Sequence, residues 1–152
     1  MTSDFMNKIN NNTVTVSTSD ELKEALEQNN GYEYIYLEND ITLNSGITIN
    51  SKKSKVTING TYQNIMHTLT GMNSSEATDT REFMSGTNKL NFTILHDTKV
   101  HLTTGNGFSS MTIHGANNVL IDERASFIFI EKSHQRIPMW AIFGNLTMKE
   151  DY

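Results

Sequence analysis

The chain carries the stretch Val56-Thr57-Ile58-Asn59-Gly60-Thr61, and related versions return at Phe92-Thr93-Ile94-Leu95 and at Met111-Thr112-Ile113-His114-Gly115-Ala116. If Thr57, Thr93 and Thr112 hold equivalent positions, the first step is 36 residues and the second is 19. The longer step then equals two turns of 18 residues, with one unmarked turn near residue 75. Repeats of this length are typical of solenoids, in which each unit buries its apolar face against its neighbours. The stretch therefore predicts a stack of short strands.

The same interval extends in both directions along the chain. Ile35 and Thr15 mark earlier turns, and Phe129 and Thr147 mark later ones. All of these steps are about 17 to 22 residues long, which is within the range of short solenoid repeats. We therefore expect a nearly constant turn length from the first strand to the last.

Short strands are predicted for most of the chain after residue 32, because brief apolar runs alternate with Asn, Gly, Asp and Ser turns. They cover residues 34–37, 41–43, 47–49, 56–58, 90–95, 100–102, 111–113, 119–121 and 127–130. One helix precedes them, with Leu22, Ala25 and Leu26 on one face and with Ser19 or Asp20 as its N-cap. A lone amphipathic helix before a run of strands suits the end cap of a solenoid.

These patterns predict an all-β fold, a right-handed parallel β-helix with an N-terminal capping helix. A β-sandwich is the alternative, since regular short strands with turn signals also describe that fold. Residues 1–12 form a flexible N-terminal arm in this interpretation, and residues 13–152 form a single β-helix domain. Residues 145–148 begin another strand with no capping element after it. We therefore expect either a fragment of a longer solenoid or end-to-end self-association through an uncapped C-terminal coil.

Composition excludes several classes of function. The formal net charge of -5 argues against nucleic-acid binding, and the one basic run, Lys52-Lys53-Ser54-Lys55, is interpreted as a solvated turn. The sequence has neither an apolar stretch long enough to span a membrane nor a signal peptide, so any export signal must have been removed. There are no cysteines, which excludes disulfides and thiolate metal sites.

Three stretches in the N-terminal part of the chain resemble a known family. They are Val16-Ser17-Thr18-Ser19-Asp20-Glu21-Leu22-Lys23-Glu24-Ala25-Leu26 and Tyr34-Ile35-Tyr36-Leu37-Glu38-Asn39-Asp40-Ile41, followed by Val56-Thr57-Ile58-Asn59-Gly60. Together they look like the N-terminal part of pectate-lyase-like right-handed β-helix proteins, especially the adhesive-domain branch of Gram-positive bacterial surface proteins. The resemblance covers residues 14–62 well and the remainder only through the rhythm of its strands. It implies that the helix caps the first coil.

The resemblance leaves the activity open, because the family includes calcium-dependent polysaccharide lyases as well as non-catalytic surface modules. A lyase needs carboxylates to hold Ca²⁺ and a basic group to take a proton. The best candidates are Asp97, Asp122 and Arg124. The simpler interpretation is that these are solvated turn charges, since nothing in the chain matches a lyase signature.

A tyrosine row offers a binding surface instead. In the run 32–37, alternation places Tyr32, Tyr34 and Tyr36 on one face and Ile35 with Leu37 on the other. Exposed rings in a row can contact sugars or anchor a protein partner. The alternative is that the row packs under the helix or the N-terminal arm. Tyr62 and Trp140 are further candidates for exposed aromatic contacts.

The sequence therefore favours a non-catalytic adhesive or ligand-binding module of an extracellular or cell-surface bacterial protein. Its partner would be a polysaccharide or a cell-surface protein, and no cofactor is expected. A carbohydrate-active enzyme using Asp97, Asp122 and Arg124 with Ca²⁺ is the alternative, and a structural spacer is a third possibility.

Overall fold

The computed structural model describes residues 12–43, 45–71, 82–94, 99–104, 111–131, 139–142 and 144–149. For strand residues 82–83, 99–104, 111–112, 127–131 and 139–141 it describes the backbone alone. This described part of the chain is mostly β, with one short helix, α2 (Ser19–Glu27).

Three parallel sheets make up the fold. Sheet A contains β1 (Thr13–Val16), β2 (Tyr34–Leu37), β5 (Lys55–Asn59), β10 (Asn91–Ile94), β13 (Asn118–Ile121) and β16 (Leu146–Met148). Sheet B contains β3 (Ile41–Thr42), β8 (Thr68–Thr70), β11 (Lys99–Thr104) and β14 (Ser126–Glu131). Sheet C contains β4 (Ile47–Thr48), β9 (Glu82–Ser85), β12 (Met111–His114) and β15 (Met139–Ala141).

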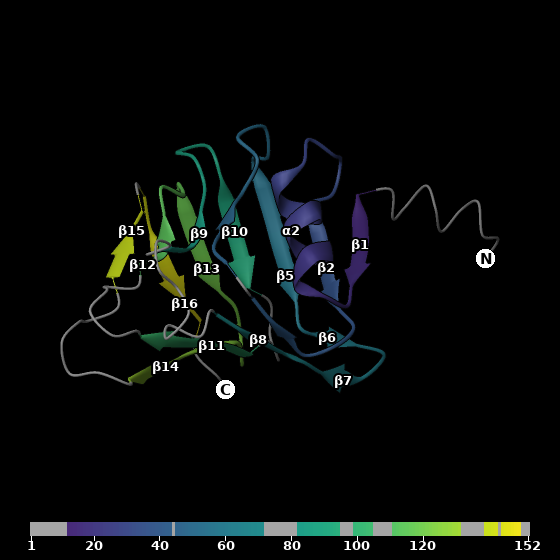
Figure 1. Cartoon of the computed structure of the whole chain (residues 1–152). Coiled ribbons are helices and arrows are strands. Elements are labelled where there is room, and N and C mark those ends of the chain that lie inside the picture. Colours follow the sequence, from purple (N-terminus) through teal and green to yellow (C-terminus); the bar gives the residue numbers. More distant parts are fainter. Residues whose placement is uncertain are drawn as a thin grey trace.

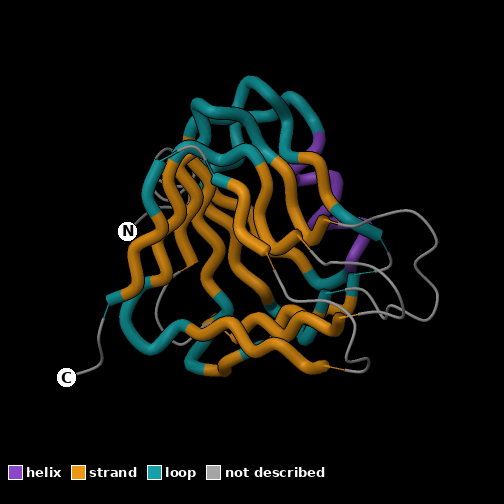
Figure 2. The backbone as a smooth tube through the Cα atoms, turned by 90° about the vertical axis from the view of Figure 1, so that its left-hand side faces the viewer, coloured by secondary structure: helices purple, strands orange, loops and turns teal. Residues whose placement is uncertain are grey.

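From β2 onward the chain visits sheets A, B and C in the same order on every circuit, and we call one such circuit a coil. Figure 1 shows the strands of sheet A side by side in sequence order, and Figure 2 shows strands on different sides of the stack joined by loops. One coil carries an insertion, the antiparallel hairpin of β6 (Thr61–Tyr62) and β7 (Ile65–Met66). Every pair within the three sheets is parallel, which favours the predicted β-helix over an antiparallel β-sandwich.

All nine predicted strands are present, and the segment 145–148 is also a strand, but the predicted turn length is wrong. Thr57 pairs directly with Thr93, so no coil lies between them. Thr93 pairs with Leu120 and Leu120 with Thr147, giving steps of 27 residues. Thr112 and Phe129 belong to sheets C and B, not to sheet A. The error has a physical cause, since strands of every sheet alternate buried and outward residues and so resemble one another in sequence.

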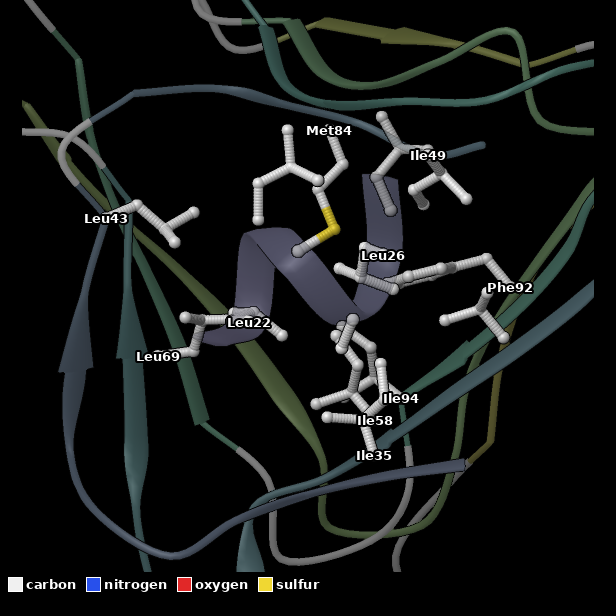
Figure 3. Packing of buried hydrophobic residues seen from close by; sticks show 14 of the residues in the cluster. Leu22, Leu26, Ile35, Leu43, Ile49, Ile58, Leu69, Met84, Phe92 and Ile94 are labelled. Atoms are coloured by element: carbon white, nitrogen blue, oxygen red, sulfur yellow. The ribbon is translucent and has the colours of Figure 1, made fainter. Parts of the chain in front are cut away.

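The core fills the space between the three sheets. Successive coils place apolar side chains at the same inward position, so Ile35, Ile58, Ile94 and Ile121 follow one another in register along sheet A and are all buried. Figure 3 shows Leu22 and Leu26 of α2 among the buried residues that the sheets and their loops contribute, namely Ile35, Leu43, Ile49, Ile58, Leu69, Met84, Phe92 and Ile94.

Helix α2 covers the N-terminal end of this core. Leu22, Ala25 and Leu26 are buried, as predicted, but the N-cap is Thr18, whose hydroxyl accepts the Glu21 N–H at 3.2 Å. Thr18 and Glu21 have the spacing of a capping box. The prediction of Ser19 or Asp20 as the N-cap did not take this signal into account.

The helix also occupies the edge of sheet C next to β4. The Asn50 N–H donates to the Leu26 carbonyl at 2.9 Å, and the Thr48 N–H donates to the Glu27 carboxylate at 3.3 Å. Lys23 donates to the Ser45 hydroxyl nearby. These bonds satisfy donors that an uncovered edge strand would expose.

The interpretation of the basic run 52–55 as a solvated turn is wrong for Lys53. The residue is only 6% exposed, and its ammonium donates to the Tyr32 carbonyl at 2.6 Å and to the Asn30 side-chain oxygen at 2.7 Å. Burial lowers the pKa of Lys53, and the charge of Glu33 opposes that shift. The long aliphatic stem lets the ammonium reach these acceptors while the rest of the side chain is buried.

An asparagine ladder links successive coils at the start of sheet A strands. The Asn118 amide donates to the Asn91 side-chain oxygen at 2.9 Å, and the Asn145 N–H donates to the Asn118 side-chain oxygen at 3.1 Å. Each asparagine precedes an apolar-x-apolar strand at a step of 27 residues. That spacing was a better marker of the coil than the Thr-Ile motif.

A glycine is required where sheet C turns toward sheet A. Gly115 has φ +77, and a Cβ atom there would lie 2.5 Å from the Gly86 carbonyl oxygen of the preceding coil. Both the left-handed backbone and the close approach exclude a larger residue without rearrangement.

We predict that Asn118→Ala lowers the free energy of unfolding by about 1 kcal/mol, because it removes ladder bonds on both sides of the residue. Asn145→Ala should cost less, since the backbone N–H of residue 145 still reaches Asn118. Urea unfolding of the two variants measures both values. Equal losses would contradict the ladder as the origin of the effect.

We also predict that Lys53→Met destabilises the fold by about 1–3 kcal/mol, because the partly buried carbonyl of Tyr32 and the side-chain oxygen of Asn30 lose their donor. Lys52→Met is the matched control, since that neighbour is exposed, and it should change stability by no more than about 0.5 kcal/mol. Thermal and urea unfolding give the comparison, and similar values for both variants would refute the structural role of Lys53.

Candidate functional site

A cluster of aromatic rings, which we call the tyrosine strip, consists of Tyr34 and Tyr36 on the outer face of sheet A and Tyr62 of the β6–β7 hairpin. In β2 the residues Ile35 and Leu37 are fully buried, while Tyr34 and Tyr36 alternate with them and are half-buried on the outside. In these four residues the structure therefore separates the rings from the aliphatic side chains, as the alternation predicted. It follows from the period of two along a strand.

The rings of the strip contact one another in sequence. Tyr34 and Tyr36 have centroids 5.0 Å apart with planes at 50°, and Tyr36 and Tyr62 have centroids 5.8 Å apart at 56°. These are tilted pairs within the favourable range for aromatic packing. The second contact joins the β6–β7 hairpin to sheet A, so the strip also holds the hairpin in place.

The hairpin extends the strip with apolar surface. Ile65 lies directly across the two strands from Tyr62 and is 60% exposed, and the adjacent Met66 is 45% exposed. The turn residues Gln63 and Asn64 both have positive φ, as a type I′ hairpin turn requires. Sequence reasoning missed this hairpin because the turn lacks glycine; the only available signal was two polar residues between Thr61-Tyr62 and Ile65-Met66.

Contacts at its base fix the hairpin to the β2–β3 loop. The His67 N–H donates to the Gly60 carbonyl at 2.8 Å, and the Asp40 carboxylate accepts the Thr68 N–H at 2.9 Å. Asp40 Oδ1 also lies 3.5 Å from His67 Nδ1. The hairpin is thus held at its base and along its Tyr62 side.

Polar groups surround the rings. The Asn59 amide donates to the Tyr34 hydroxyl at 3.2 Å, and Glu38, which follows β2 two residues after Tyr36, contacts the Ser17 hydroxyl. Burial raises the pKa of the Tyr34 phenol above its ordinary value of 10.0; the Asn59 bond opposes this shift, and Tyr36 adds to it. Sequence reasoning did not identify Asn59 as part of this surface.

Tyr32 and Trp140 are the two remaining candidate binding residues, and neither is part of the tyrosine strip as defined above. Tyr32 precedes β2 and packs against the hydrophobic core, so it does not extend the strip as the alternation predicted. Trp140 lies in β15, but its side chain is outside the described residues.

Two of the three candidate catalytic residues, Asp122 and Arg124, fall at a turn between β13 and β14. Asp122 accepts the Glu123 N–H at 2.8 Å through its side chain and the Ala125 N–H at 3.0 Å through its carbonyl. Lys149 approaches its carboxylate at 3.4 Å. Arg124 is exposed with φ 59, a conformation that belongs to the same turn. Asp97 lies outside the described residues.

These contacts give Asp122 a structural role in closing the turn and in pairing with the next coil. Among the described residues there is no group of three or more His, Cys, Asp or Glu side chains that could hold a metal ion. Within the same part of the chain, the single helix is too short and too polar to cross a membrane.

We predict that Tyr34 loses its proton above pH 10, so Tyr34→Phe should remove one phenol transition from that range of a spectrophotometric titration. Because the folded state holds this proton more tightly than the unfolded state, its contribution to stability is complete below pH 10 and is lost as the pH rises further. The contribution of Lys53 to stability changes with pH in the opposite direction, because folding lowers the pKa of this residue.

Relative to Tyr34→Phe, the wild type should therefore lose stability from about pH 9 to about pH 11, where phenols titrate. Unfolding at the two pH values checks this. A constant difference would show that the environment of Tyr34 does not perturb its titration.

The comparisons with known proteins give a family match that fits the mostly β fold of the described residues. The family model for a pectate lyase-like adhesive domain matches residues 13–152. No match was found among curated proteins or among solved structures. Since the family match covers almost the whole chain, this protein belongs to the pectate lyase-like adhesive domain family.

Proposed function

We propose that this chain is a non-catalytic adhesive module that binds its ligand through the tyrosine strip and the adjoining hairpin. The observation that carries the proposal is the continuous surface from Tyr34 through Tyr36 and Tyr62 to Ile65, held on a rigid sheet by ring contacts. Membership of an adhesive domain family supports the same role. Such a role requires no cofactor and places the protein outside the cell or on its surface.

The scaffold in this proposal is a right-handed parallel β-helix. Three parallel sheets visited in a fixed order support it, because each strand returns to its sheet only after passing through the other two. Connections between parallel strands of one sheet are right-handed in about 98% of cases. The family match also fits this hand.

The ligand we favour is an uncharged polysaccharide. Tyrosine presents a large apolar ring with a polar hydroxyl, which suits the mixed surface of a sugar. The amide of Asn59 adds hydrogen-bonding capacity beside Tyr34. Glu38, two residues after Tyr36 in the sequence, and the formal net charge of -5 disfavour polyanionic ligands such as uronate polymers.

The enzyme alternative has less support. Asp122 and Arg124 lie in one tight turn, and Asp122 is already engaged by Glu123 and Lys149. A calcium-dependent lyase would need these groups to be directed at a substrate and a cation instead. A purely structural spacer remains the outcome if neither binding nor turnover is measured.

We predict that affinity electrophoresis in gels containing neutral galactan or β-glucan retards the wild type more than gels containing polygalacturonate. Tyr36→Ala should weaken retardation by about 10-fold or more, because it removes the central ring of the strip. Leu120→Ala is the matched control, since Leu120 is half-buried on the outer face of the same sheet, in register with Thr93 and away from the strip.

The same preparations are then incubated with polygalacturonate and Ca²⁺ while ultraviolet absorbance of unsaturated products is followed. A calcium-dependent signal that disappears in Arg124→Ala would overturn the non-catalytic proposal. Equal retardation of Tyr36→Ala and the wild type would move the binding site away from the strip. A lack of retardation in every gel would instead direct the search to protein ligands.

A further inference from the structure

The buried amine of Lys53 lies against the side-chain amide of Asn30, a residue 23 positions earlier in the sequence. Lys53 Nζ is 2.7 Å from Asn30 Oδ1, and Lys53 as a whole is only 6% exposed. Because Oδ1 is bonded to the carbonyl carbon Cγ, a small rotation of the amide plane brings Cγ within reach of the amine. Holding a nucleophile and a carbonyl carbon in contact is the main requirement for a bond to form between them.

The amine of Lys53 has the environment of a nucleophile. An ammonium group cannot attack a carbonyl carbon, so the lysine must first lose a proton. Burial lowers the pKa of Lys53, which increases the fraction of the neutral amine relative to an exposed lysine. The two carbonyl groups that it contacts, those of Tyr32 at 2.6 Å and Asn30 at 3.4 Å, hold Nζ beside the Asn30 side chain.

Both ends of the Asn30 amide are held by backbone groups. Its Oδ1 accepts the Tyr32 N–H at 3.1 Å, and its Nδ2 donates to the Glu24 carbonyl at 3.3 Å. Attack on Cγ would place negative charge on Oδ1, and an N–H already directed at that atom stabilises such charge. The amide of Asn30 is therefore positioned and polarised as an electrophile.

Glu33 supplies a carboxylate to the same site. Its side chain is half-buried, and its negative charge raises the pKa of Lys53, opposing the effect of burial. The backbone of Glu33 is fixed on both sides, since its N–H donates to the Asn12 carbonyl at 2.8 Å and its carbonyl accepts the Thr57 N–H at 2.7 Å. A carboxylate that acts on a reacting amine can serve as its general base.

We propose that Lys53 and Asn30 join in an intramolecular amide bond, with Glu33 carrying the proton. After the ammonium has lost one proton to solvent, the Nζ lone pair attacks Cγ, and Glu33 accepts a second proton from Nζ. The tetrahedral intermediate carries its negative charge on Oδ1, which the Tyr32 N–H stabilises. The bond from Cγ to Nδ2 then breaks, Glu33 returns the proton to Nδ2, and ammonia leaves. No oxidant and no second substrate are needed.

The bond would tie the loop after α2 to the turn before β5. Hydrogen bonds already join these segments, because the Asn50 N–H donates to the Leu26 carbonyl at 2.9 Å and the Asn50 amide donates to the Glu27 carbonyl at 3.0 Å. A covalent link between distant residues also restricts the unfolded chain. The modification would therefore fix the helix that covers the N-terminal end of the core.

Intact-mass spectrometry of the purified, denatured protein tests the proposal. The wild type should weigh about 17 Da less than its sequence requires, because aminolysis by lysine releases one ammonia. Trypsin cleaves after Lys23, Lys52 and Lys55 but not after an acylated Lys53, so the product should appear as peptide 24–52 joined to peptide 53–55. Fragmentation of this branched peptide locates the bond at Asn30.

Substitutions separate the three roles. Lys53→Met and Asn30→Ala should each have the full calculated mass, whereas Asn29→Ala should retain the loss. Asn29→Ala is the matched control, because Asn29 is the exposed neighbour of Asn30. Glu33→Gln keeps the amine and the amide in contact, and it should reduce the linked fraction by about 10-fold or more because the general base is lost.

Asn30 precedes Gly31, and an Asn-Gly pair can also lose ammonia by cyclising onto its own backbone. That reaction needs no lysine, so a loss of mass that persists in Lys53→Met would overturn the proposal. A wild type with its full calculated mass and no branched peptide would overturn it as well. Equal linked fractions in Glu33→Gln and the wild type would overturn the assignment of Glu33 as the base.

Discussion

Each coil of this protein depends on the coil before it, because inward apolar side chains at equivalent positions stack directly on one another. Ile35, Ile58, Ile94 and Ile121 form one such column along sheet A. A single coil of short strands cannot bury its own apolar face, so stability accumulates through contacts between neighbours. Backbone pairing, the asparagine ladder and the glycine at position 115 all preserve the same register. The coils can differ in length only where loops leave the stack, and the β6–β7 hairpin is one such departure.

A stack of this kind has two ends, and the sequence treats them differently. At the N-terminal end, α2 buries Leu22 and Leu26 over the first coils and donates and accepts bonds along the edge of sheet C. Lys53 then ties the loop after the helix to the chain that enters β5. At the other end of the described strands, Leu146 and Met148 remain exposed.

The outer face is free to carry function because alternation separates it from the core. Side chains such as Tyr34 and Tyr36 point away from the columns of isoleucine that hold the coils together. Substitutions on this face therefore leave the buried columns of isoleucine unchanged. The hairpin adds to this surface without altering the register of β5 with β10. Its contact through Tyr62 keeps Ile65 in a defined position beside the sheet.

The sequence by itself determined the local structure. Alternating apolar residues set the strands, the spacing of Leu22, Ala25 and Leu26 set the helix, and Tyr34 with Tyr36 was placed outside because these patterns depend only on neighbours along the chain. Tertiary structure alone decided which strands pair. Strands of sheets A and C have similar sequences, so Thr112 could not be assigned to its sheet from its motif. The burial of Lys53 and the contact of Tyr36 with Tyr62 likewise join segments about 20 or more residues apart, and only coil stacking brings them together.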